Sequence, residues 1–112
     1  ISSVKALYPG KKITGVFQPH LFSRTRDFAD GFAESLSMLD ELLLLEIYPA
    51  RELPIQGVTA AMILGKVTCP KKKLCTKEEV LSLVKSSKPE VLLTLGAGDI
   101  DQLVSPLQKI LS

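Results

Sequence analysis

The segment with the strongest chemical character is GVFQPHLFSRTRD, where an apolar run ends at a proline. The chain's only histidine, His20, follows directly, and Arg24 and Arg26 come next. A proline keeps the residue before it out of the helical region, so the run is expected to be a strand that stops there. A guanidinium beside the first amides of a helix is a receptor for carboxylate or phosphate. The segment therefore predicts an anion site, and the alternative is that both arginines are solvated surface charges.

The helix after this strand is expected to be capped by Ser23 or Thr25, so that Arg26 and Asp27 fall in its first turn. Asp27 suits the positive end of the helix dipole, whereas the two arginines do not. A cation at that end is mildly unfavourable unless an anion binds beside it. This mismatch favours a binding role for the segment.

A second loop, LGAGDID, contains Gly96, Ala97, Gly98 and Asp99 near the end of the chain. Its glycines permit close backbone approach to a ligand. The pattern lacks the third glycine of a dinucleotide fingerprint, so a tight turn between a strand and a helix is the alternative. The Asp99 carboxylate would repel a phosphate bound directly on this turn.

A third loop, EIYPARELPIQG, follows the apolar run LLLLEIY and shows no helical periodicity. Pro49 and Pro54 stiffen it, and Gly57 ends it. Tyr48, Arg51 and Glu52 are its polar side chains, and Tyr48 is a candidate for supporting the anion site. A plain surface connection is the alternative.

The rest of the chain alternates between strand and helix patterns. Four strands are expected, at Lys11–Gln18, Leu42–Tyr48, Lys72–Cys75 and Glu90–Gly98. Apolar residues recur at helical spacing over residues 28–39, 58–65 and 103–111, which predicts a helix in each range. A capping box at Thr76–Glu79 predicts the start of another helix. At Pro106 the last helix is expected either to kink or to begin afresh.

This alternation predicts one α/β domain with a mainly parallel sheet flanked by helices. Ligands of such sheets bind at the carboxyl ends of the strands, where the strand order switches. If the strand order is 3-2-1-4, the loops QPHLFSRTR and GAGD leave neighbouring strands side by side. Two distant segments would then form one site.

Composition narrows the possible functions. A chain of 112 residues with 46% hydrophobic residues fits a single domain with a real core. A net charge of +2 is too small to indicate nucleic-acid binding. Cys69 and Cys75 are expected to be free thiols in a reducing compartment. No apolar run reaches the roughly 18 residues that a membrane span needs, and neither a metal-ligand cluster nor a phosphate-binding P-loop is present. The chain looks like half of an active site.

The segments GVFQPHLFSRTRDFADGFAESL, LLLLEIYPARELPIQGV and LLTLGAGDID together resemble the C-terminal domain of the Mur ligases of peptidoglycan synthesis, and most closely its alanine-adding members. The resemblance covers nearly the whole chain and implies a Rossmann-like fold over residues 1–112. It also implies a longer, cytoplasmic, three-domain enzyme whose other domains hold ATP with Mg²⁺ and the UDP sugar. The first residues, ISSVKALYPGKK, resemble the tail of a helix and include no initiator Met, so the chain is expected to be a piece of a longer protein.

The resemblance also implies a function for the site. An acyl phosphate forms from UDP-N-acetylmuramate and ATP, and L-alanine attacks it. His20, Arg24, Thr25 and Arg26 would lie where alanine and phosphate meet, and Arg24 is the expected carboxylate ligand. Many family members have arginine where this chain has Leu21. The chain alone would catalyse nothing, and no nucleic acid or membrane would be involved. A different class of function is a free-standing α/β module that binds a small anion or a partner protein.

Overall fold

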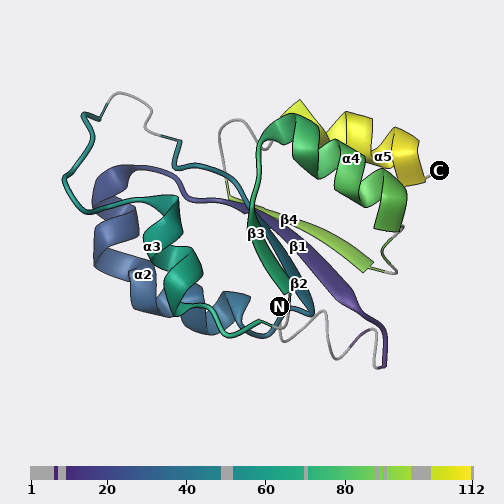
Figure 1. Cartoon of the computed structure of the whole chain (residues 1–112), viewed down its shortest axis with the longest axis horizontal. Coiled ribbons are helices and arrows are strands. Elements are labelled where there is room, and N and C mark those ends of the chain that lie inside the picture. The colour runs from purple at the N-terminus through teal and green to yellow at the C-terminus, as the bar shows by residue number, and fades with distance from the viewer. Residues whose placement is uncertain are drawn as a thin grey trace.

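The protein is an α/β domain in which four parallel strands lie between two pairs of helices (Figure 1). The computed structural model describes residue 7 and residues 10–48, 52–69, 71–87, 89, 91–96 and 102–111. The strands are β1 (Ile13–Gln18), β2 (Glu41–Leu44), β3 (Lys71–Leu74) and β4 (Val91–Gly96). The helices are α2 (Phe22–Leu36), α3 (Ala60–Lys66), α4 (Lys77–Ser87) and α5 (Val104–Leu111). The expected helix tail at the start of the chain falls almost wholly outside the described residues.

The strand order is β3-β2-β1-β4, which is the order that brings the first and last strands together. The register pairs Phe17 of β1 with Leu44 of β2 on one side and with Leu95 of β4 on the other. At the end of β1, Gln18 pairs with Gly96. The adjacency predicted for the loops after these two strands is therefore confirmed as far as Gly96, beyond which Ala97, Gly98 and Asp99 lie outside the described residues.

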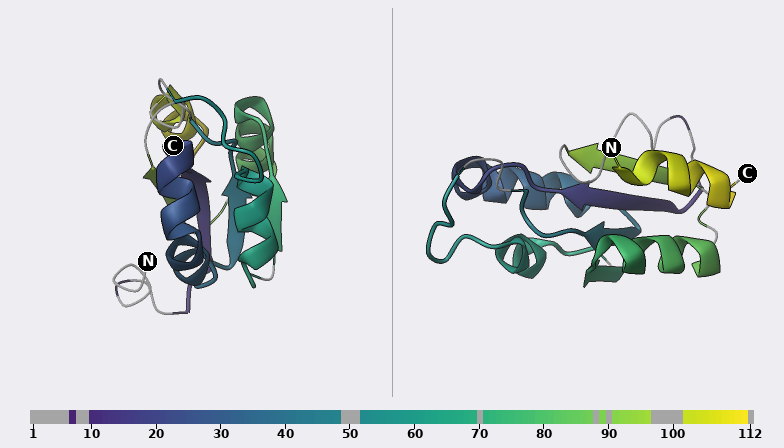
Figure 2. Two further views of the ribbon diagram at one scale, coloured as in Figure 1. Left: turned by 90° about the vertical axis from the view of Figure 1, so that its left-hand side faces the viewer. Right: turned by 90° about the horizontal axis from the view of Figure 1, so that it is seen from above.

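Each face of the sheet has its own hydrophobic core. Ile13, Phe17 and Leu42 point to α2 and α3, whereas Val16 and Leu43 point to α4 and α5. This alternation follows from the period of two along a strand. The two helices of each pair lie side by side, α2 with α3 and α4 with α5 (Figure 2). Because both faces are covered, the apolar runs read as nearly continuous in sequence.

Several element boundaries differ from the expectations. The second strand ends at Leu44 rather than Tyr48, level with the end of its outer neighbour β3 at Leu74. Beyond Leu44 the continuous ladder gives way to separate contacts with the β1 side: Leu45 N donates to Phe17 O, and Tyr48 forms an isolated bridge with His20. Pro106 neither kinks α5 nor starts it. It lies in the first turn of that helix, where backbone amides have no intrahelical partner and a proline is tolerated.

The starts of α3 and α4 are capped by side chains adjacent to them in sequence. The capping box predicted at Thr76 is confirmed, since Glu79 N donates to Thr76 Oγ1 and Thr76 N donates to Glu79 Oε1. The second cap was not predicted: Thr59 accepts a hydrogen bond from Met62 N at 3.2 Å at the start of α3.

Candidate functional site

A cavity of about 670 Å³ opens at the carboxyl end of β1 and is lined along most of the length of α2, from Arg24 to Ser35. Its polar lining residues are Gln18, His20, Arg24 and Ser35, and its apolar ones are Phe17, Phe28, Gly31 and Phe32. The aromatic rings form a continuous group, with Phe32 5.3 Å from Phe17 and 6.5 Å from Phe28 between ring centroids. The cavity therefore combines an aromatic wall with a small number of polar groups, as ligand sites commonly do.

Arg24 is the cationic group of this cavity. Its side chain is exposed, and within the described residues it has no hydrogen bond and no ion pair. A guanidinium that lines a cavity without an internal acceptor is available to a carboxylate or phosphate, which it can bind through two parallel hydrogen bonds.

His20 is held at the rim by the loop that follows β2. Its ring stacks on Tyr48 with centroids 5.8 Å apart and planes 14° from parallel. The two residues also form an isolated parallel bridge, in which Tyr48 N donates to Pro19 O and Leu21 N donates to Tyr48 O, each at 2.8 Å. Tyr48 therefore fixes the orientation of His20 in two ways, by stacking of the two rings and by the hydrogen bonds of its backbone.

The backbone between His20 and α2 is strained. Leu21 has a φ of 70°, a conformation that L residues other than glycine seldom adopt. Hydrogen bonds on both sides maintain it, since Leu21 N donates to Tyr48 O and Leu21 O accepts from Thr25 N and Thr25 Oγ1. Strain maintained in this way is typical of functional junctions.

The expected cap of α2 is wrong. The helix begins at Phe22, so Ser23 and Thr25 lie inside it, and neither Arg26 nor Asp27 is in its first turn. The cap is instead Glu52, from the loop after β2: Ser23 N donates to Glu52 Oε1 at 3.0 Å, and Ser23 Oγ donates to Glu52 Oε2. The bond from the Ser23 hydroxyl is the main reason why the pKa of Glu52 is lowered, with the Ser23 amide second. Sequence reasoning missed this role because the cap lies 29 residues away.

The candidate residues separate into two groups in the structure. His20 and Arg24 both line the cavity, and Tyr48 supports them. Thr25 is fully buried and its hydroxyl donates to Leu21 O at 2.8 Å. Arg26 does not line the cavity, and its Nε donates to Asp27 Oδ1 at 2.9 Å, a bond that raises the pKa of Arg26.

Two features of the cavity had no counterpart in the sequence reasoning. Phe28 has non-helical backbone angles (φ −116°, ψ 15°) inside α2, and its side chain is 58% exposed. A helical pattern predicts a buried Phe28, and the kink explains why the ring lines the cavity instead. Gln18 is buried, and its amide donates to Glu46 O at 3.1 Å, which ties the end of β1 to the loop that contains Tyr48.

The chain has curated relatives that match it over nearly its whole length. No protein-family model matches the chain. The chain is 62% identical over 111 residues to a UDP-N-acetylmuramate–L-alanine ligase from Parabacteroides distasonis, and 54% identical to the ligases of the same name from Flavobacterium johnsoniae and Porphyromonas gingivalis. These matches cover 98–99% of the chain. The chain belongs to the Mur ligase family.

The match is to one part of these ligases. The chain spans about a quarter of the relatives' length, 24–25%, and corresponds to their C-terminal portion. The fold agrees with a solved Mur ligase domain, from a Haemophilus ducreyi protein named as a UDP-N-acetylmuramate:L-alanyl-γ-D-glutamyl-meso-diaminopimelate ligase. That domain superposes with a TM-score of 0.64 over 99% of this chain and 77% of its own, at 16% identity.

Three further kinds of feature bear on function: a metal site, reactive cysteines and a membrane-spanning helix. Among the described residues no three His, Cys, Asp or Glu side chains are grouped as a metal site. Cys69 and Cys75 are buried free thiols, and burial is the main reason why the pKa of each is raised. None of the helices described has the length and apolar character needed to span a bilayer. Within the described residues, the cavity around Arg24 is the candidate for binding a substrate.

Proposed function

We propose that this chain is the C-terminal domain of an ATP-dependent ligase that joins L-alanine to UDP-N-acetylmuramate, and that it binds the incoming alanine and closes over the other domains. The observation that supports the proposal most directly is Arg24, a cation without an ion pair among the described residues, which lines a cavity next to the strained strand-to-helix junction. The substrates in this proposal are taken from the names of the relatives. The relatives are about four times as long as this chain, which is long enough for the other domains.

In this ligase the carboxylate of UDP-N-acetylmuramate becomes an acyl phosphate at the expense of ATP. The alanine amine then displaces phosphate and forms the amide. ATP and Mg²⁺ belong to the rest of the enzyme, because the described residues of this chain offer no metal-ligand cluster and its sequence has no P-loop. The 112-residue chain alone should consequently show no alanine-dependent ATP turnover.

Arg24 binds the alanine carboxylate in this proposal. The guanidinium fork would hold that carboxylate, so that the amine faces the acyl phosphate supplied by the neighbouring domain. His20 lies beside it at the rim of the cavity, held by Tyr48. Glu52 adds a reason for preferring alanine over phosphate as the ligand of Arg24, since its negative charge at the start of α2 repels a multiply charged phosphate more than a singly charged carboxylate.

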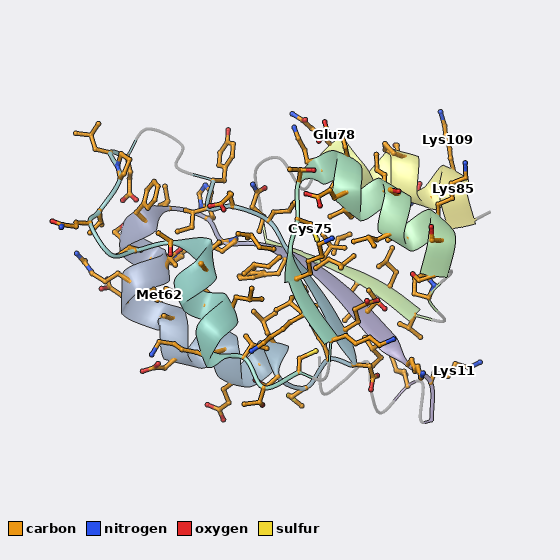
Figure 3. The ribbon with its side chains drawn as sticks, in the orientation of Figure 1. Lys11, Met62, Cys75, Glu78, Lys85 and Lys109 are labelled. Carbon is orange, nitrogen blue, oxygen red and sulfur yellow. The ribbon has the colours of Figure 1, made fainter. Side chains whose placement is uncertain are left out.

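Steady-state kinetics of the full-length ligase test the proposal, with L-alanine and ATP varied separately. Arg24→Ala should lower kcat/KM roughly ten- to hundredfold, the loss expected for one charge-assisted hydrogen bond, mainly through the KM for L-alanine. Lys85→Ala is the matched control, because Lys85 is exposed on α4 and projects away from the sheet (Figure 3). A fall in kcat alone would assign Arg24 to the transferring phosphate, and unchanged values for both substrates would refute the proposal.

A further inference from the structure

Helix α2 has no cap from its own sequence neighbours. The residue at its N-cap position is Leu21, which has no side-chain hydrogen-bond acceptor. The Glu52 carboxylate performs this function, since it accepts hydrogen bonds from both the amide and the hydroxyl of Ser23. A contact between segments 29 residues apart thus completes the first turn of the helix.

This contact fills the place where an external anion would be expected. The start of a helix attracts anions because its first amides are unpaired and the dipole is positive there. In this protein the anion already present is Glu52. A substrate carboxylate therefore meets the guanidinium of Arg24 rather than the first amides of α2.

The same contact determines how Arg24 is presented. Ser23, which Glu52 holds, directly precedes Arg24 in the first turn of α2. On the other side of the turn, Leu21 N donates to Tyr48 O. The loop after β2 therefore forms hydrogen bonds to the start of α2 at two points, through the backbone carbonyl of Tyr48 and through the side chain of Glu52. Without the hydrogen bonds from Ser23 to Glu52, the first turn of α2, which contains Arg24, would be free to fray.

We infer that Glu52 is a positioning residue for substrate binding: its carboxylate fixes the first turn of α2 so that Arg24 faces the cavity. The inference rests on the proposed function, because it assumes that Arg24 binds the alanine carboxylate. Glu52 itself does not line the cavity and acts through Ser23 and Arg24.

The test is steady-state kinetics of the full-length ligase with Glu52→Ala and Glu52→Gln. Glu52→Ala should raise the KM for L-alanine about three- to tenfold, with kcat and the KM for ATP changed less than about twofold. Glu52→Gln keeps an oxygen that can accept from Ser23 N but loses the charge, so its KM should rise at least about twofold and less than in the alanine variant. Glu34→Gln removes the same charge from an exposed position on α2 and should change none of these values.

Three outcomes would overturn the inference. An unchanged KM for L-alanine in both variants would show that Arg24 does not depend on Glu52. A loss of kcat without a change in KM would show a role in stability alone. A lower KM would show that Glu52 competes with the substrate anion instead of preparing its site. If Glu52→Ala does not fold, Glu52→Gln decides by the same criteria.

Arg24→Ala in the same assay separates this inference from the proposed function. If Arg24→Ala raises the KM for L-alanine and the Glu52 variants do not, only the positioning role fails. If Arg24→Ala leaves both KM values unchanged, the proposed function fails, and any effect of Glu52 then has another cause.

Discussion

The rings of His20 and Tyr48 stack at 5.8 Å across the gap between the loop after β1 and the loop after β2. The stack joins two segments that are far apart in sequence, directly at the rim of the cavity. The backbone bridge between the same residues would remain if the tyrosine ring were removed. The contribution of the stacked ring can therefore be measured separately from that of the loop.

Replacing Tyr48 tests this contribution. Tyr48→Ala should lower the free energy of unfolding by at least about 0.5–1.5 kcal/mol, the value of an aromatic pair beyond its buried area. Tyr48→Phe keeps the ring and should stay within about 0.5 kcal/mol of the unsubstituted protein. Urea unfolding of the two variants gives the comparison. Equal stability of the alanine and phenylalanine variants would mean that the stack contributes nothing.

The conformation of Leu21 leads to a second prediction, in which the usual order of alanine and glycine is reversed. At a φ of 70° a side chain is strained and glycine is not. Leu21→Gly should therefore be more stable than Leu21→Ala by roughly 0.5–1 kcal/mol, after allowance for the greater freedom of glycine in the unfolded chain. Both variants lose the leucine side chain, so their difference isolates the backbone.

The matched comparison uses Glu34, which is exposed in the second half of α2. There Glu34→Gly should be less stable than Glu34→Ala by about 1 kcal/mol, the ordinary helix penalty. Thermal unfolding of all four variants provides the measurement. If glycine is the less stable residue at both positions, Leu21 is not strained.

The capping box of α4 predicts a dependence of stability on pH. Hydrogen bonding from the Thr76 backbone is the main reason why the pKa of Glu79 is lowered from 4.5. A lowered pKa in the folded state means that this carboxylate stabilises the fold above its unfolded pKa, and that the stabilisation is lost as the pH falls through the folded value. Glu79→Gln should therefore show a smaller fall in Tm between about pH 6 and about pH 3 than the unsubstituted protein.

Glu34→Gln controls for the loss of one negative charge, because within the described residues Glu34 has no hydrogen bond or ion pair. Its Tm should fall with pH as in the unsubstituted protein. An NMR titration of the Glu79 carboxyl carbon provides a direct check. A Glu79 titration at or above 4.5 would contradict the capping role.

The sheet and the adjacency of the strand ends beside the candidate site could be predicted from sequence because both depend on general rules. Buried parallel strands give nearly continuous apolar runs, and such runs predicted β1, β2 and β4. The carboxyl-edge rule then placed the loop that contains His20 beside the end of β4, and the pairing of Gln18 with Gly96 confirms it. Neither rule depends on a particular side-chain contact.

The cap of α2 could not be predicted because its hydrogen-bond acceptor is distant in sequence. Capping rules search the residues next to a helix start, and Ser23 and Thr25 were suitable by that criterion. The structure instead uses Glu52, while Ser23 becomes a donor inside the helix. The available signal was an acidic residue in a loop expected at the same edge of the sheet. Choosing it over its neighbours requires the three-dimensional positions of both loops.

Arg24 gives the last prediction, which concerns the stability of this domain rather than catalysis. A side chain retained for folding would have internal partners, and removing it would leave those partners unsatisfied. Arg24 is exposed and has neither a hydrogen bond nor an ion pair within the described residues. Arg24→Ala should accordingly change the free energy of unfolding of the chain by no more than about 0.5 kcal/mol, as for ordinary surface positions.

Thr25→Ala provides the contrast in the same helical turn. Thr25 is fully buried, and its hydroxyl donates to the carbonyl of the strained Leu21. Losing that hydrogen bond should cost about 0.5–1.5 kcal/mol, and the lost methyl group adds to this cost. Urea unfolding of both variants should therefore show a stable Arg24→Ala and a weakened Thr25→Ala. The opposite order would mean that Arg24 serves the fold, and its exposure beside the cavity would then no longer support a role in binding alanine.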